Sequence, residues 1–118
     1  MKVPTRQPGS SSSIGELIDL FPTACEATGL TIPKGVEGKS LFPVLENPKT
    51  TGKEAAFSFV SKGTSMRTSQ WAYMKYGDGS EELYDMKKDS KQFVNLAQSA
   101  GYAKVLASLR NQFKNARK

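Results

Sequence analysis

The chain has 118 residues, with 17 Lys and Arg against 11 Asp and Glu, and its formal net charge is +6. This length suits one domain with a modest core, and the positive charge favours polyanionic partners such as nucleic acid or sulfated glycans. A single cysteine and no histidine exclude zinc sites of the Cys/His type and histidine-dependent catalysis, and no apolar run approaches the roughly 20 residues of a membrane span.

The first elements expected are a lead-in and a helix. Residues 1–13 hold two prolines, a glycine and four consecutive serines, and this composition favours a flexible, exposed lead-in. Apolar residues then recur at helical spacing, which predicts a helix that begins near Leu20, has Asp19 as its N-cap and ends at Gly29. Residues 14–118 are therefore predicted to form the folded part.

A loop, a short helix and a series of strands follow. Ser40 is placed to cap a helical stretch from Leu41 to Leu45. Beyond it, a glycine at position 63 is expected to break the first strand, and short segments of alternating side chains predict an antiparallel meander. The four expected strands are residues 55–60, 65–68, 71–76 and 82–85.

The last element is the most regular. One apolar stripe of an amphipathic helix is formed by Tyr102, Val105, Leu106, Leu109 and Phe113. We expect this helix to pack on the sheet. The predicted fold class is therefore α+β: a small four-stranded antiparallel sheet packed against a C-terminal amphipathic helix, preceded by an N-terminal helix and loop.

Three features could carry chemistry, and each has a plainer explanation. Cys25 lies on an apolar helical pattern and is interpreted as a small buried hydrophobe. Five acids within twelve residues could hold calcium, but their spacing lacks the pattern of a calcium loop and favours a solvated turn and strand edge: Asp78, Glu81, Glu82, Asp85 and Asp89. Interleaved bases and aromatics could stack single-stranded nucleic acid, or half of them could face the core: Arg67, Trp71, Tyr73, Lys75 and Tyr76.

Several blocks, in the same order along the chain, resemble the C-terminal region of the sulfatase family, most closely its iduronate-2-sulfatase-like branch. They are residues 17–23 (LIDLFPT), 38–45 (GKSLFPVL), 65–68 (SMRT), 79–86 (GSEELYDM) and 95–97 (NLA). Two positions depart from the usual closing pattern, because Ser90 stands where the family commonly has proline and Gln92 where it commonly has glutamate. The resemblance covers the chain from about Ile14 to its end.

The resemblance implies a parent enzyme that hydrolyses sulfate esters, of sulfated sugars in particular, with calcium and a formylglycine made from a cysteine. The family's nucleophile motif is Cys-x-Pro/Ala-Ser-Arg, and residues 25–29 (CEATG) match only its first and third positions. We therefore expect no catalytic, cofactor or metal residue in this fragment. The implied partners are the large catalytic domain of the same chain and the sulfated sugar, and the family is typically extracytoplasmic. From the composition we expect no membrane contact, and the distribution of charge does not favour nucleic acid.

Three residues are candidate substrate contacts: Lys62, Ser65 and Arg67. The planar guanidinium of Arg67 suits bidentate binding of a sulfate or an anionic sugar. An internal ion pair of Arg67 with Glu82 on a neighbouring strand is the alternative. The predicted function is thus a non-catalytic C-terminal subdomain of a sulfatase that completes the fold and one wall of the substrate cleft. The alternative function is a freestanding basic module that binds nucleic acid or sulfated glycan.

Overall fold

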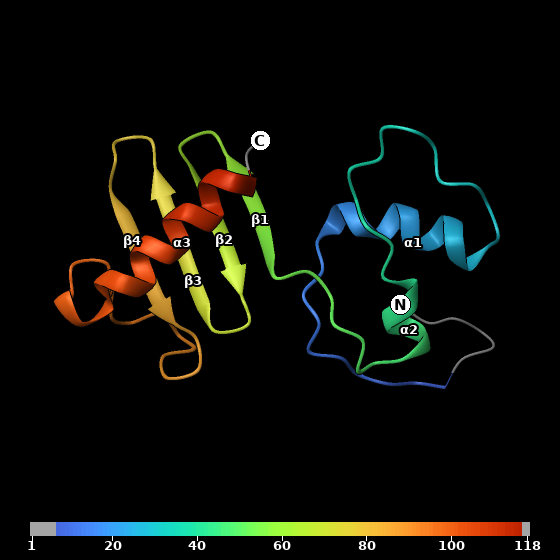
Figure 1. The fold of residues 1–118 in the computed structure, drawn as a ribbon, viewed down its shortest axis with the longest axis horizontal. Coiled ribbons are helices and arrows are strands. Elements are labelled where there is room, and N and C mark those ends of the chain that lie inside the picture. Colours follow the sequence, from blue (N-terminus) through green and yellow to red (C-terminus); the bar gives the residue numbers. More distant parts are fainter. Residues whose placement is uncertain (1–6, 117–118) are drawn as a thin grey trace. The chain divides into compact units, whose positions relative to one another are not determined.

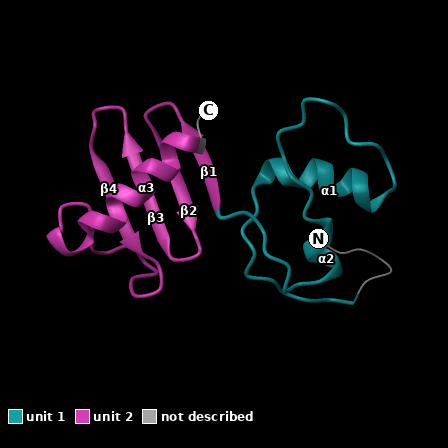
Figure 2. Cartoon of the chain, viewed as in Figure 1, with its two compact units in different colours: residues 1–54 teal, residues 55–118 magenta. Residues whose placement is uncertain are grey.

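The computed structural model describes residues 7–116 and divides the chain into two compact units, residues 1–54 (unit 1) and residues 55–118 (unit 2) (Figure 2). The first six residues of the predicted lead-in lie outside the described part. No helix in the described residues is both long enough and apolar enough to cross a membrane.

Unit 1 contains the first helices of the chain (Figure 1). A 3-10 turn, η1 (Leu17–Asp19), leads directly into α1 (Leu20–Ala27), so the predicted start of the helix at Leu20 is confirmed. Gly29, with φ of +71°, ends α1 as predicted, because glycine has no Cβ to oppose a positive φ. A short second helix, α2 (Phe42–Glu46), begins one residue later than predicted.

The side chain of Asp19 does not cap α1, although Asp19 occupies the N-cap position. Its carboxylate turns inward and accepts hydrogen bonds from the backbone N–H of Glu16 at 2.8 Å and of Lys39 at 2.7 Å. Lys39 can come this close because Gly38 packs against the carbonyl of Ile18 with no room for a Cβ. The carboxylate therefore ties a distant loop to the start of the helix.

The serine run continues into unit 1 along a neighbouring loop. Ser11 Oγ donates to the carbonyl of Pro48 at 2.7 Å, and Ser13 Oγ donates to that of Thr50 at 2.6 Å. Residues 7–12 are exposed.

Unit 2 is an antiparallel meander whose strands are hydrogen-bonded in sequence order, as predicted. The strands are β1 (Ala55–Val60), β2 (Gly63–Thr68), β3 (Trp71–Tyr76) and β4 (Glu81–Asp85). Gly63 begins β2 instead of breaking a strand, because it pairs with Val60 across a two-residue turn. After β4 the chain passes through a 3-10 turn, η2 (Ala100–Tyr102), into α3 (Ala103–Ala116).

Helix α3 crosses one face of the sheet, as predicted (Figure 1). Its apolar stripe buries Leu106, Leu109 and Phe113 against a side chain from each of three strands. These are Met66, Tyr73 and Leu83. Because side chains alternate along a strand, the residues between them point to the opposite face, which we call the open face.

The segment that resembles the family's closing pattern covers the outer edge of β4. Asn95 Oδ1 accepts the backbone N–H of Leu83 at 3.0 Å, and the carbonyl of Leu83 accepts the N–H of Leu96 at 2.8 Å. Asn95 Nδ2 also donates to the carbonyl of Glu81 at 3.2 Å. The backbone groups of an edge strand are thereby satisfied by a loop.

Candidate functional site

The three predicted substrate residues fall into two places. Ser65 and Arg67 alternate with the buried Met66 on β2, so both lie on the open face of the sheet. Lys62 lies exposed in the turn between β1 and β2. The structure therefore brings Ser65 and Arg67 to one face and leaves Lys62 at a hairpin tip.

The open face gives Arg67 small neighbours. Its partners across the ladders are Ala56 on β1 and Ala72 on β3, and its own side chain is exposed. Among the residues that the structure describes, Arg67 forms no ion pair. Glu82, the proposed internal partner, instead accepts the Tyr84 hydroxyl at 3.0 Å. The guanidinium is therefore free to bind an external oxyanion.

The aromatic and basic residues that could have formed a stacking surface are divided between the two faces. Tyr73 is fully buried and packs edge-on against Phe113, with ring centroids 5.5 Å apart. Trp71 packs edge-on against Tyr102 of η2 in the same layer. Arg67 lies on the opposite face. The structure thus supports the core interpretation of Trp71 and Tyr73 and forms no continuous aromatic platform from the five residues.

The five clustered acids have separate partners, and for three of the acids the partner is a backbone N–H nearby in the sequence. Asp78 accepts the N–H of Ser80, Asp85 accepts that of Lys87 and Asp89 accepts that of Val94. The first two are Asx-type bonds, which hold turns, and the third spans five residues of the loop after β4. In residues 7–116, no group of three or more His, Cys, Asp or Glu side chains converges as metal ligands would. Cys25 is buried in α1, which agrees with its interpretation as a small hydrophobe.

Glu81 differs from the other acids because it joins two layers of unit 2. It forms an ion pair with Arg110 of α3 and accepts the hydroxyl of Tyr73 at 2.5 Å. Hydrogen bonding from Arg110 lowers the pKa of Glu81, although its partial burial opposes that shift. Burial and the neighbouring Glu81 raise the pKa of Tyr73, so its phenol stays protonated. The amino-acid sequence offered only a weak signal here, the placement of Arg110 one turn after Leu106.

Beside this pair lies a cavity of about 320 Å³. It opens between the last turns of α3 and the β3–β4 hairpin, and we call it the basic groove. Its main lining side chains are Tyr73, Lys75, Glu81, Arg110, Phe113 and Lys114. The sequence alone does not reveal this groove, because it forms only when the helix lies on the sheet.

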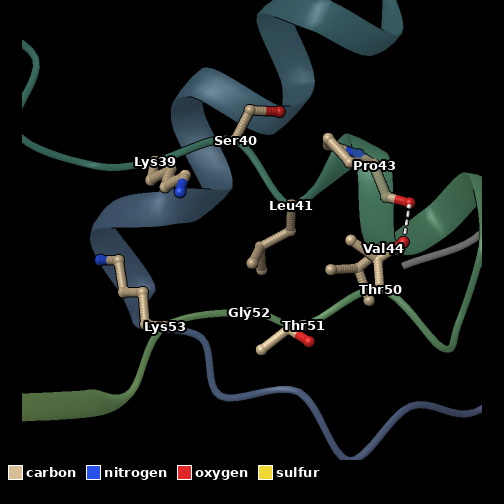
Figure 3. Close-up of a pocket in the computed structure, with 9 residues that line it drawn as sticks. All are labelled: Lys39, Ser40, Leu41, Pro43, Val44, Thr50, Thr51, Gly52 and Lys53. Atoms are coloured by element: carbon tan, nitrogen blue, oxygen red, sulfur yellow. Dashed lines mark hydrogen bonds between the residues drawn. The ribbon is translucent and has the colours of Figure 1, made fainter.

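A second, smaller cavity, of about 130 Å³, lies in unit 1 (Figure 3). Its walls include Leu41, Pro43 and Val44, and Thr50 Oγ1 donates to the carbonyl of Pro43 at 3.3 Å (Figure 3). The ammonium group of Lys53, another lining residue, is already paired with Glu16 and Asp19. The hollow is mostly apolar, and of its two lysines only Lys39 has no ion pair within the described residues.

Apolar side chains of η1 and α1 face outward in unit 1. The exposed fractions are 86% for Leu17 and 55% for Phe21, and Ile18 and Leu20 are also exposed. Asp19, in the middle of this run, is completely buried. A helix that packs on the core of its own domain has the opposite pattern: its apolar side chains face the core and its charged side chains face solvent. We call Leu17, Ile18, Leu20 and Phe21 the outward apolar face.

Comparison with known proteins relates this chain to the C-terminal regions of sulfatases. The family model described as N-sulphoglucosamine sulphohydrolase, C-terminal, matches residues 1–118. In Bacteroides thetaiotaomicron, a Delta 4,5-hexuronate-2-O-sulfatase is 35% identical over 103 residues, covering 79% of this chain and 21% of its own length. An N-acetylglucosamine-6-O-sulfatase of the same organism is 33% identical over 109 residues, covering 80% of this chain and 20% of its own length.

A solved structure of a 2-O GAG sulfatase aligns with a TM-score of 0.72 and 32% identity, covering 83% of this chain and 23% of that one. The alignment therefore includes most of both units. The chain spans about one fifth of the length of the curated relatives it matches.

Proposed function

Since this chain belongs to the family of sulfatase C-terminal regions, we propose that it is the non-catalytic C-terminal subdomain of a longer sulfatase. The family match over the whole chain, set beside relatives about five times as long, supports this proposal. Residues 14–118 would be the subdomain and residues 1–13 the connection to a large catalytic domain.

The outward apolar face is the observation that carries the proposal. Exposing Leu17 and Phe21 while burying a carboxylate is unfavourable for a freestanding unit, since each buried large apolar side chain contributes roughly 1.5–3 kcal/mol. The arrangement is favourable if another part of the same protein covers it. We infer that the large domain packs against this face. The hydrogen bonds and ion pair of the buried Asp19 would hold η1 and α1 in the conformation that this docking requires.

The open face of unit 2 supplies the substrate contacts in this proposal. Arg67 would bind an oxyanion of the substrate with its planar guanidinium, and the hydroxyl of Ser65, two residues earlier on the same face, would add a hydrogen bond. Lys62 would attract the anion from the hairpin tip. These residues bind and orient, and the chemistry belongs to the large domain.

The substrate is proposed to be a sulfated sugar. A 2-O-sulfated hexuronate is the first choice, because both the hexuronate-2-O-sulfatase and the 2-O GAG sulfatase are relatives. This agrees with the iduronate-2-sulfatase-like branch expected from the sequence blocks. The 6-O-sulfatase relative is almost as similar, so a 6-O-sulfated N-acetylglucosamine is the natural comparison substrate.

Calcium and formylglycine, which the family uses, do not fit residues 7–116. No three acids there converge, the cluster from Asp78 to Asp89 is divided among separate turns and Arg110, and the thiol of Cys25 is buried inside unit 1. We propose that the parent enzyme holds both groups in its large domain, so that no residue of this chain takes part in a catalytic step.

The test is a sulfate-release assay on the full-length protein and on residues 1–118 alone, with both sulfated sugars. We expect release by the full-length protein and none by the fragment. Docking is tested by Leu17→Ser with Phe21→Ser, which should lower the melting temperature of the full-length protein. Phe93→Ser is the matched control, because Phe93 is 79% exposed outside the outward apolar face. An inactive full-length protein, or equal melting shifts, would contradict the proposal.

A further inference from the structure

The basic groove of unit 2 has the properties of a binding site that the proposed function does not use. We propose that it binds the anionic groups of a sulfated sugar chain, as an accessory site separate from the substrate contacts on the open face. It lies on the helix side of the sheet, whereas Ser65 and Arg67 lie on the other side. The inference does not depend on catalysis.

The walls of the groove come from three segments. Lys75 lies on β3, directly across the ladder from Glu81 on β4. Arg110 and Lys114 lie one turn apart on α3, so they project from the same side of the helix. All four side chains line the same cavity of about 320 Å³, which is large enough for a sulfated sugar unit.

The charges of the groove do not cancel. The carboxylate of Glu81 is already occupied by Arg110 and by the Tyr73 hydroxyl. Within the described part of the chain, neither Lys75 nor Lys114 lies within salt-bridge distance of a carboxylate. Two lysine side chains therefore line the open cavity beside a guanidinium that is held in place by its own partner. Lys75 also lies close enough to Glu81 for its charge to help lower the pKa of that carboxyl, so the groove keeps an excess of positive charge without a second ion pair in the described residues. A fixed cation loses less freedom on binding than a mobile one.

The helix dipole does not account for the whole set. Lys114 in the last turn of α3 complements the helix dipole, but Lys75 is on a strand, where no such dipole acts. The floor of the groove is rigid, since Tyr73 and Phe113 are packed edge to face and almost fully buried. Their ring faces are not available to stack bases, which favours a sugar chain over single-stranded nucleic acid.

The experiment measures binding of a fluorescein-labelled, heparin-derived hexasaccharide to the full-length protein by anisotropy at physiological salt. The double variant Lys75→Ala/Lys114→Ala should weaken binding about tenfold, since two partly exposed charge contacts are lost. Raising the salt concentration should reduce the difference in affinity between this double variant and the unsubstituted protein. Lys87→Ala/Lys88→Ala, which removes two lysines that are also exposed from the turn after β4, should change affinity less than twofold.

Equal weakening by the two double variants would overturn the proposal, because binding would then follow overall charge. The same conclusion would follow if the hexasaccharide did not bind, or if sodium sulfate at matched sulfate concentration competed as well as the unlabelled hexasaccharide. Tighter binding of a single-stranded oligonucleotide would overturn the choice of ligand. If the double variant has a lower melting temperature than the unsubstituted protein, the single variants Lys75→Gln and Lys114→Gln replace it in the test. Each should weaken binding about threefold.

Discussion

Arg110 and Glu81 fasten the last helix to the last hairpin of the sheet: Nε of Arg110 lies 2.9 Å from Oε1 of Glu81. A second bond joins the guanidinium to Oε2, so the contact is bidentate. Arg110 is 47% exposed and Glu81 12%, and solvent therefore screens part of the attraction. The same carboxylate also receives the buried Tyr73 hydroxyl.

Glu81→Gln should therefore destabilise unit 2 by about 1–2 kcal/mol, because both the ion pair and a charged hydrogen bond are weakened. Hydrogen exchange of the amides in residues 55–116 of the full-length protein measures the effect locally. Glu82→Gln is the matched control, since Glu82 accepts only the Tyr84 hydroxyl among the hydrogen bonds described. Equal acceleration of exchange in the two variants would show that the Arg110 contact contributes little.

Asp19→Asn should destabilise unit 1 by about 2–4 kcal/mol. The substitution removes the buried charge that pairs with Lys53, whose Nζ lies 2.7 Å from Oδ1. One amide oxygen must then serve the N–H groups of Glu16 and Lys39 together. Faster exchange of the amides in residues 16–53 is the expected observation. Glu26→Gln, on the exposed side of the same helix, should leave exchange unchanged, and a comparable change there would count against this explanation.

The same network predicts how the stability of unit 1 depends on pH. Burial opposes ionisation of Asp19, but hydrogen bonds from Lys53, Lys39 and Glu16 outweigh it and lower the pKa below 3.8. A carboxyl with a lowered pKa stabilises the fold above its unfolded pKa of about 3.9, and this contribution is lost as the pH falls through the folded value. The amides of residues 16–53 should therefore be protected from hydrogen exchange at pH 5–8 and lose this protection below about pH 4. In Asp19→Asn, this acid-dependent loss should be reduced, and an unchanged profile would assign it to other groups.

Asn95→Ala should destabilise the edge of the sheet by about 1–3 kcal/mol, because the N–H of the buried Leu83 loses its acceptor. The uncovered edge should also promote self-association, which light scattering would detect beside the melting temperature. Asn111→Ala, an exposed position on α3, is the control. Identical melting curves for the two variants would mean that the loop stays in place without its asparagine.

Arg67→Ala in the full-length protein should lower kcat/KM on the sulfated sugar about tenfold, mainly through KM, if Arg67 binds a substrate oxyanion. Arg67→Lys should recover only part of the loss, since an ammonium lacks the planar fork. Lys87→Ala is the control for a general charge effect. Unchanged kinetic constants in Arg67→Ala would remove Arg67 from the substrate site.

Periodicity predicted most of unit 2. The alternation around Met66 and the helical stripe from Tyr102 to Phe113 each indicate one buried face, and these two faces meet in the structure. Local patterns do not contain the contacts between distant segments. Asp19 looked like a helix cap because its position was right, yet its partners lie at Lys39 and Lys53, which only the folded chain brings near.

The substrate candidates show the same limit. The sequence indicated a strand at residues 65–68, but it could not tell whether Arg67 would be paired with Glu82. The answer depends on side-chain contacts between strands: in the structure Glu82 accepts the Tyr84 hydroxyl, and Arg67 forms no ion pair among the described residues. The basic groove was missed because it needs Lys75 from a strand and Lys114 from the helix.

Because Gly38 packs tightly against Ile18, an uncharged position influences the ionisation of Asp19. A methyl group at position 38 would push the loop away from η1, and the N–H of Lys39 would then leave the carboxylate of Asp19. Gly38→Ala adds no charge, yet it should raise the pKa of Asp19 toward the ordinary value. A substitution that sequence comparison would class as conservative would thus appear in experiment as a change in acid tolerance.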